Sequence, residues 1–372
     1  MRDQGNAIIY RHRKAIWFWP LVLSCFGILT IASITSRGGL SGQINLYSIS
    51  GRQLFALVLG FISMFITSMI PLSFWRKYSS IFWIGAVVLT AATLIPGIGI
   101  ERGGARRWLS IGPFMLQPLE LLSLFVPMHL SKCLSDTDGK PLEVFIRITI
   151  IIALASVWPL LLQPDFGGTV LIVVLCMSIH VESRGWKYPL CGIPILAALA
   201  YPMVSFFGYR TRRITAFLDP WSDPLSSGFQ TIQGLIAFAN GGIAGVGIGK
   251  GLQKNYLPAA HTDYIFPAIG EEFGIIGTFG ILAVFGFWFL VVWGLYRRQR
   301  DVFLSTLTWG IAASVALPLF INLGGVMNII PLTGIPLPFI SYGGSALWVV
   351  WIKIGVLVRI AKESALKTEI RN

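Results

Sequence analysis

Charged side chains are scarce in this 372-residue chain. Asp, Glu, Lys and Arg together account for 12% of the residues, while hydrophobic residues account for 55% and the mean hydropathy is +0.73. Soluble globular domains usually carry roughly 25% charged residues. The composition therefore excludes a soluble domain and indicates an integral membrane protein, for which we expect no nucleic-acid partner.

Several common kinds of site are also missing from the sequence. The four cysteines have no paired spacing, which argues against a disulfide framework or a zinc site. The glycine run GGIAGVGIGKG lacks the GxxxxGK[ST] spacing and follows no predicted strand, so it is not a nucleotide-binding fingerprint. Low-complexity tracts and convincing internal repeats are absent too. We therefore expect one polytopic membrane domain, residues 1–372.

Long apolar runs are abundant. Ten of them approach the roughly 20 residues that cross a bilayer as a helix: residues 16–34, 54–70, 81–95, 118–130, 145–162, 167–179, 190–207, 265–293, 304–321 and 347–360. The first run has no cleavage site before Arg37 and is expected to remain as an anchor. The expected fold is all-α, with about ten transmembrane helices. A long extracytoplasmic loop, residues 208–264, would join helices 7 and 8 and hold a short amphipathic or re-entrant helix at residues 231–240.

Basic residues set the orientation of such spans. Most of the 29 lysines and arginines lie in alternate loops, which all face the same side of the membrane. We therefore expect that side, with both termini, to be cytoplasmic, and we count Lys353 among the basic residues there. Ten would face outward, mostly in two loops: Arg37, Arg52, Arg102, Arg106, Arg107, Arg210, Arg212, Arg213, Lys250 and Lys254. Basic residues crowded on that face suggest an anionic ligand there.

The first of these outer loops reads ERGGARRWLSIGPFMLQPLE. Arg106 and Arg107 offer planar donors that suit phosphate, and Trp108 offers a ring suited either to stacking on a sugar or to anchoring at the interface. Glu120 lies at the start of an apolar run, where it either gains from the helix dipole or faces a polar cavity.

The second outer loop, residues 208–264, is too apolar for a solvated linker. Arg210, Arg213, Lys250 and Lys254 supply positive charge there, and the glycine run can bring backbone amides close to an anion. The loop is therefore a second candidate for anion binding.

Three acids follow in the stretch HTDYIFPAIGEEFG, residues 261–274. Eight helical residues rise about 12 Å, so Asp263 is expected near the outer surface and Glu271 and Glu272 deeper. A carboxylate at a membrane helix centre costs about 2.5–3.5 kcal/mol to insert. We expect the two glutamates to stabilise helix breaks at the neighbouring Pro and Gly residues or to pair with a buried base. Asp263 either meets a substrate at the headgroup level or caps the helix.

Two further outer turns carry polar residues beside apolar runs. QPDFG holds Gln163 and Asp165, and the Pro- and Gly-rich PLTGIPLPFISYGGSALW holds Ser341, Tyr342 and Ser345. Irregular backbone persists at membrane depth only where it lines protein or a wet cavity. Four outer loops are therefore expected to converge on one polar groove with a basic rim.

Five motifs together resemble those of the SEDS family (shape, elongation, division and sporulation) over nearly the whole chain: QPDFG, YRxxR followed by AFLDPWxDP, GGxxGxGxGxGxQK, HTDYIF and GIPLPFISYGGS. AFLDPWSDP and QPDFG resemble the division-type branch, FtsW, more than the elongation-type branch, RodA. The resemblance implies a ten-span peptidoglycan glycosyltransferase of the bacterial cytoplasmic membrane. It would polymerise the precursor lipid II with inversion at the anomeric carbon, and undecaprenyl pyrophosphate would leave.

The resemblance also implies roles and partners. Asp263 matches the family's catalytic aspartate and would be the general base. A divalent cation, Mg²⁺ or Mn²⁺, would bridge Asp263 and phosphates, although no metal-ligand spacing in the sequence shows it. A class B penicillin-binding protein transpeptidase and divisome proteins are the implied partners. The candidate substrate-binding residues are Arg107, Trp108, Glu120, Gln163, Asp165, Arg210, Arg213, Lys250, Lys254, His261, Thr262, Ser341, Tyr342 and Ser345.

The chain departs from the family pattern near Glu120. Ser123 stands where a lysine usually follows the glutamate by three residues, so Glu120 is expected to pair with Arg106 or Arg107 or to be protonated. Ala259 also replaces a usual acid. Other functions use the same features: a flippase for lipid II, since broken helices and intramembrane acids suit transport, or a non-catalytic scaffold of the division machinery. An elongation-type polymerase is the third alternative.

Overall fold

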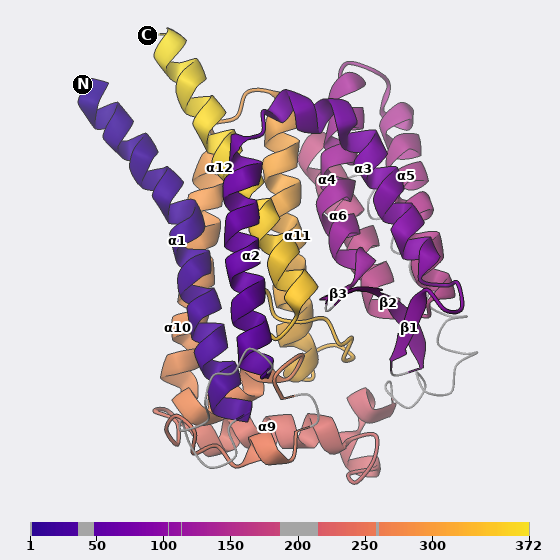
Figure 1. Cartoon of the computed structure of the whole chain (residues 1–372), viewed down its shortest axis with the longest axis vertical. Coiled ribbons are helices and arrows are strands. Elements are labelled where there is room, and N and C mark those ends of the chain that lie inside the picture. The colour runs from indigo at the N-terminus through magenta and orange to yellow at the C-terminus, as the bar shows by residue number, and fades with distance from the viewer. Residues whose placement is uncertain are drawn as a thin grey trace.

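The computed structural model describes residues 2–35, 48–102, 104–112, 114–186, 215–257 and 260–371. Its long helices run side by side as a bundle, with both termini at one end and helix α9 (Phe229–Gly241) lying across the other end (Figure 1). The bundle helices in the described ranges are α1 (Arg2–Thr35), α2 (Ile49–Met69), α3 (Leu72–Ala92), α4 (Pro118–Asp136), α5 (Leu142–Leu162), α6 (Phe166–Arg184), α10 (Ile265–Tyr296), α11 (Val302–Val326) and α12 (Gly344–Arg371).

The helices agree with the expected spans. Every expected span except residues 190–207, which lie outside the described residues, overlaps one of these helices. Seven of them are long and apolar enough to cross a membrane: α2, α5, α6, α10, α11, and the parts Lys14–Thr35 of α1 and Gly344–Ala365 of α12. The expected all-α multi-pass architecture is therefore confirmed.

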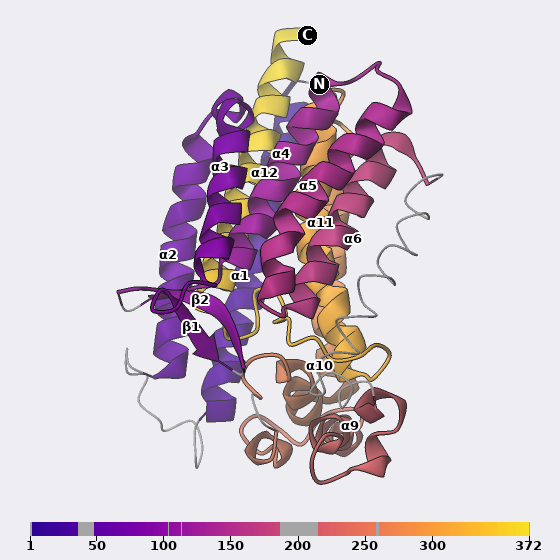
Figure 2. The ribbon, with the colours of Figure 1, turned by 90° about the vertical axis from the view of Figure 1, so that its right-hand side faces the viewer.

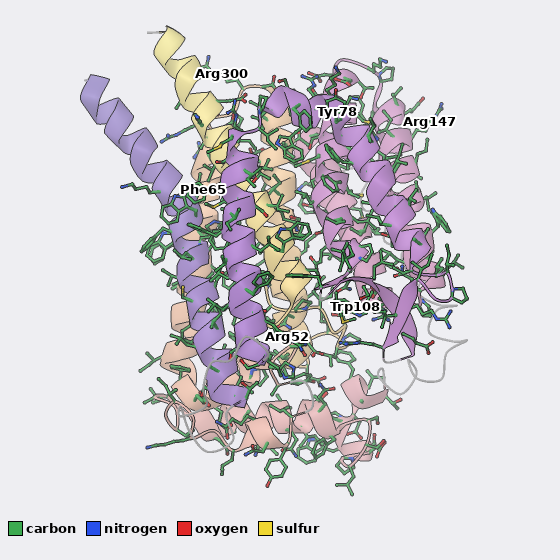
Figure 3. The ribbon with its side chains drawn as sticks, viewed as in Figure 1. Arg52, Phe65, Tyr78, Trp108, Arg147 and Arg300 are labelled. Atoms are coloured by element: carbon green, nitrogen blue, oxygen red, sulfur yellow. The ribbon has the colours of Figure 1, made fainter. Side chains whose placement is uncertain are left out.

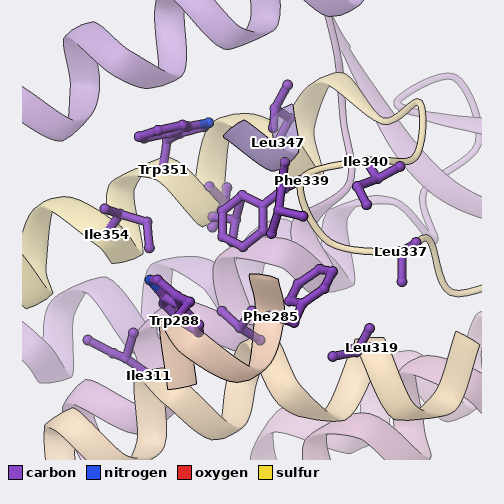
Figure 4. Packing of buried hydrophobic residues seen from close by; sticks show 14 of the residues in the cluster. Phe285, Trp288, Ile311, Leu319, Leu337, Phe339, Ile340, Leu347, Trp351 and Ile354 are labelled. Carbon is purple, nitrogen blue, oxygen red and sulfur yellow. The ribbon is translucent and has the colours of Figure 1, made fainter. Parts of the chain in front are cut away.

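Two hydrophobic cores hold the bundle together. The larger lies among α1, α2, α10, α11 and α12, where Trp288, Trp351, Phe285 and Phe339 pack against one another (Figure 4). The smaller lies among α3, α4, α5 and α6, on the other side of the molecule (Figure 2). Since α11 contacts α4 and α6 as well as α10 and α12, it joins the two halves.

The first outer loop contains a three-stranded antiparallel sheet, a feature that the expected all-α fold did not include. Its strands are β1 (Gly99–Arg102), β2 (Ala105–Ile111) and β3 (Phe114–Leu116). Gly104, at φ 76°, and Gly112, at φ 60°, lie in the two tight turns, where a left-handed backbone favours glycine. The sheet carries Trp108 at the same end of the molecule as α9 (Figure 3).

Helix α10 breaks at Gly274, whose φ of 65° and ψ of −163° are not helical. The backbone groups released there pair with the glycine-rich loop that follows α9. The amides of Ile275 and Ile276 donate to the carbonyls of Gly242 and Ile243 at 2.9 and 3.1 Å. Such pairing satisfies polar groups that a membrane would otherwise leave without partners. Hydrogen bonds therefore hold this loop, residues 242–247, against α10. Further along the chain, the short helix η3 (Gln253–Asn255) also contacts α10.

Candidate active site

Asp263 lies in the turn just before α10 and is half-buried. Thr262 Oγ1 donates a hydrogen bond to Asp263 Oδ1 at 2.8 Å, and Asn322 Nδ2 donates to the Asp263 carbonyl at 2.9 Å. The N-cap residue of α10 is Tyr264 and not Asp263, so the interpretation of Asp263 as a helix cap is wrong. Among the residues that the structure describes, no ion pair includes the Asp263 carboxylate.

The loop before α12 packs directly against this turn. Ser341 Oγ donates to the Thr262 carbonyl at 2.6 Å, and the Tyr342 amide donates to the His261 carbonyl at 2.8 Å. The rings of His261 and Tyr342 lie 5.7 Å apart. Burial lowers the pKa of His261, while the charge of Asp263 opposes that shift. The structure thus brings together Asp263 and four of the predicted site residues.

A cavity of about 60 Å³ opens beside this loop. One buried water requires roughly 10–15 Å³, so the cavity has room for a few waters. Gly334 lines it, and a Cβ atom on Gly334 would lie 3.8 Å from Asp263 Oδ2. The polar and charged lining residues are Arg107, Gln117, Glu120, Asp165, Ser314, Thr333, Ser341 and Lys353. Of the four outer loops predicted to converge, those of Arg107, Asp165 and residues 333–341 line this polar hollow, whereas no described residue of the loop 208–264 does.

Arg107, on β2, forms one wall of the cavity. Its Nη2 donates to the Pro164 carbonyl at 2.8 Å, and its Nη1 lies 3.7 Å from Asp165 Oδ1. Asp165 is 4% exposed and caps α6 by accepting from the Gly168 amide at 3.1 Å. Asp165 is therefore a helix cap that also orients Arg107, whose side chain is about one-third exposed and lines the cavity, as does that of Lys353.

Glu120 forms neither of the ion pairs expected for it among the described residues. Arg106 pairs with Glu101 at 3.3 Å on the surface, and Arg107 lies against Asp165. Glu120 instead lines the cavity together with Lys353, which comes from α12. Lys353 is 2% exposed, so its assignment to the cytoplasmic face is also wrong. No sequence pattern links these two positions, because they meet only when α4 and α12 pack.

Lys254, which the sequence suggested as a phosphate ligand, is buried and bonded to the protein's own groups. Its Nζ donates to the Gly249 and Ser33 carbonyls at 2.8 and 3.1 Å and lies 3.4 Å from Glu272 Oε1. Lys254 is thus the buried base predicted as a partner for one of the two glutamates. The other glutamate, Glu271, accepts from the amides of Leu252 and Gln253. Both carboxylates hold the outer loop to α10.

Backbone amides of the glycine run likewise donate to carbonyl groups of the protein itself. The amides of Val246 and Gly247 donate to the carbonyls of Glu271 and Glu272 at 2.9 and 3.0 Å. A Cβ on Gly245 would lie 2.3 Å from the Glu272 carbonyl oxygen. The glycines therefore permit close packing on α10, and the predicted anion contact by these amides is wrong.

The remaining predicted residues are spread out. Gln163 is buried, does not line the cavity and donates to Thr90 and Thr93. Ser345 Oγ accepts from the Gln117 amide at 3.3 Å. Lys250 is exposed on the outer loop, and Trp108 is half-buried on β2. Arg210 and Arg213 lie outside the described residues.

Three residues that the sequence did not single out help to build the site. Asn322 Nδ2 bridges the carbonyls of Asp263 and Ile335, at 2.9 and 2.8 Å. Gln53 donates to the Ser341 carbonyl at 2.9 Å and accepts from the Gly343 amide at 3.1 Å. Lys353 is the third. A signal existed for each, since a lone polar side chain inside or beside an apolar run indicates a buried polar contact.

The residues around Asp263 suit a metal only when a substrate supplies further ligands. Within the described residues, no group of three or more His, Cys, Asp or Glu side chains lies together. Mg²⁺ is commonly held by one or two carboxylates plus phosphate oxygens and waters. Asp263, whose Oδ2 points towards Gly334 at the cavity, fits that pattern.

Fold and site together define a polytopic membrane protein with a carboxylate and an arginine-lined cavity at the end opposite its termini. A model of the FtsW/RodA/SpoVE family, described as cell cycle protein, matches residues 13–366. The chain belongs to this family. It is 36% identical over 351 residues, 92% of this chain and 90% of the relative, to a probable peptidoglycan glycosyltransferase FtsW of Saccharophagus degradans.

Another relative and two chains of solved structures are also similar to this chain over most of its length. Stage V sporulation protein E of Bacillus subtilis is 37% identical over 323 residues, which cover 84% of this chain and 87% of that protein. A chain from a solved structure that concerns the coordination of polymerization and crosslinking by a peptidoglycan synthase complex matches with a TM-score of 0.78 at 26% identity, covering 94% of this chain and 97% of that one. RodA of Thermus thermophilus matches with a TM-score of 0.71 at 23% identity, covering 94% and 96%.

Proposed function

We propose that this protein is a peptidoglycan glycosyltransferase that joins lipid II units into glycan strands, with Asp263 as the general base. The observation that carries the proposal is the position of Asp263. Its carboxylate caps no helix, takes part in no ion pair of the described residues, and lies beside the loop that lines the Arg107 cavity. The names of the FtsW relatives support the same activity.

The reaction assigns one task to Asp263. The sugar 4-hydroxyl of one lipid II attacks the anomeric carbon of the other, and a glycosidic C–O bond forms while the bond to pyrophosphate breaks. The hydroxyl proton passes to Asp263, undecaprenyl pyrophosphate leaves, and the anomeric configuration inverts. A general base must lie within hydrogen-bond reach of the proton that it takes. The bond from Thr262 to Oδ1 orients the carboxylate, and Oδ2 points towards Gly334.

The leaving pyrophosphate requires positive charge close by. Arg107 supplies it at the cavity, because Asp165 and the Pro164 carbonyl fix its guanidinium. Arg210 and Arg213 remain our candidates for further phosphate contacts. Trp108 is on the same strand as Arg107 and remains a candidate for stacking on a sugar.

The proposed setting is the bacterial cytoplasmic membrane, with both termini in the cytoplasm and the site facing outward. Both termini lie at the end opposite α9, which supports this arrangement (Figure 1). The FtsW names of most relatives favour cell division over cell elongation. A class B penicillin-binding protein transpeptidase is the proposed partner, since a similar solved chain comes from a peptidoglycan synthase complex that coordinates polymerization and crosslinking.

Purified protein and lipid II test the activity directly. We expect glycan strands on a gel when detergent-solubilised protein is incubated with lipid II, together with the partner transpeptidase if the protein alone is inactive. The flippase alternative predicts instead that lipid II crosses the bilayer of proteoliposomes without forming polymer. Neither polymer nor transport, in protein that still elutes as a folded species, would leave the scaffold function.

Chelation tests the proposed metal. With EDTA in excess, we expect polymerisation to fall at least about tenfold and to return when Mg²⁺ or Mn²⁺ is added, because a cation held by Asp263 would supply positive charge that stabilises the transition state. Gel densitometry measures the strands. A matched incubation with EDTA already saturated by Ca²⁺ controls for effects of the chelator itself. Full polymerisation in EDTA would rule out the cation while leaving Asp263 as base.

A further inference from the structure

Helix α12 contains a lysine at a depth where a cation is expensive to bury. Lys353 is 2% exposed and lies within the span Gly344–Ala365. Its neighbours along the helix, Trp351 and Ile354, are fully buried in the larger core (Figure 4). An ionisable side chain placed so deep in a membrane bundle indicates a specific partner and a specific function.

The contacts of Lys353 connect three helices. Its Nζ donates to Ser123 Oγ on α4 at 2.8 Å and to the Ser314 carbonyl on α11 at 3.4 Å. Ser123 Oγ in turn donates to the Glu120 carbonyl at 2.6 Å, and the Glu120 side chain lines the same cavity as Lys353. The ammonium therefore ties α12 to α4 and α11 at one point.

That point forms part of the wall of the cavity beside Asp263. Glu120 and Lys353 both line it, and residues 333–339 of the loop before α12 line it as well. Asn322 bonds both this loop, at Ile335, and the Asp263 carbonyl. Because α12 begins at Gly344, directly after the loop, the position of α12 governs the position of the loop.

We propose that Lys353 is a positioning residue: its ammonium, held by Ser123 and Ser314, fixes α12 and the loop of residues 333–339, and thereby sets Asp263 against the cavity. The inference rests on the proposed glycosyltransferase activity. Lys353 acts through the loop and touches no reacting atom. Its removal therefore lowers kcat and leaves substrate binding nearly unchanged, which is the signature of an interaction that matters in the transition state.

The contact between Lys353 and Ser123 makes a sharp test possible. Since Lys353 Nζ lies 2.8 Å from Ser123 Oγ, a lysine at position 123 reaches the same place from α4 once position 353 is alanine. We expect Lys353→Ala to lower kcat for lipid II polymerisation at least about tenfold, with KM changed less than about twofold. Ser123→Lys alone places two ammonium groups together and is also impaired. The double variant, Ser123→Lys with Lys353→Ala, recovers to within about threefold of the unmodified protein.

Controls separate positioning from folding. Lys362→Ala, an exposed lysine on the same helix, is expected to leave activity unchanged. All variants are assayed well below their thermal midpoints, and the midpoints form a second cycle that needs no substrate. We expect the double variant to melt above both single variants. If Lys353→Ala does not fold, the double variant still carries the ammonium and still tests the inference.

Two results would overturn the inference. One is full kcat in Lys353→Ala; the other is a folded double variant no more active and no more stable than Lys353→Ala. Failure of the proposed function is distinguishable, because the unmodified protein would then form no polymer. In that case the thermal midpoints alone test the contact between α4 and α12. The contact is rejected if the midpoint change of the double variant equals the sum of the changes in the two single variants.

Discussion

Replacing Asp263 with asparagine is expected to slow lipid II polymerisation by about 10²- to 10⁴-fold, the range that a positioned general base contributes. Asparagine has nearly the same shape, and its amide oxygen still accepts the hydrogen bond from Thr262 Oγ1. The Asp263 carbonyl keeps its bond from Asn322. The fold is therefore preserved while the proton acceptor is lost. The measurement is the initial rate of strand formation, with lipid II binding followed separately.

Asp223→Asn is the matched control for this substitution. Asp223 is exposed in the outer loop, and its Oδ2 accepts from the amide and hydroxyl of Ser227, bonds that an asparagine oxygen also accepts. We expect that variant to polymerise at the unmodified rate. Substantial activity in Asp263→Asn would show that another group takes the proton. Equal loss in both variants would show that the assay reports disturbance of the outer loop.

The sequence predicted the features that depend on composition and depth. Apolar runs give helices at residues 265–296 and 302–326 because a membrane leaves backbone polar groups no other partner. Such predictions need no knowledge of which helix lies next to which. The rise of a straight helix placed Glu271 and Glu272 deeper than Asp263, but α10 breaks at Gly274 and both glutamates bond to the outer loop.

The features that the sequence left open depend on that knowledge. Lys353 and Ser123 are 230 residues apart and meet only because α12 packs beside α4. The pairing of Lys254 with Glu272 likewise needs the outer loop to fold back on α10. The sequence suggests Lys254 as a phosphate ligand, and only the structure shows that its side chain is buried against Glu272.

The Lys254 pairing leads to a second large effect, on stability. Removing one partner of a buried ion pair typically costs 3–5 kcal/mol, because the remaining charge has no counterion. Lys254→Met is therefore expected to destabilise the protein by about 3–5 kcal/mol, since Glu272, 1% exposed, would keep only the hydroxyl of Ser33. Glu272→Gln should cost less, because the Gly249 and Ser33 carbonyls still accept from Lys254.

Thermal unfolding of detergent-solubilised protein, followed by tryptophan fluorescence, measures these effects. Lys250→Met, an exposed lysine in the same loop, should leave the midpoint unchanged. The double variant, Lys254→Met with Glu272→Gln, should regain much of the loss, because no uncompensated charge remains. Limited proteolysis gives a second readout. In Lys254→Met, cleavage should begin in the outer loop at residues 242–251, because the carbonyl of Gly249 loses its bond to Lys254. If Lys254→Met instead weakened lipid II binding with an unchanged midpoint, Lys254 would be a phosphate ligand after all, and its burial beside Glu272 would describe a state that the substrate opens.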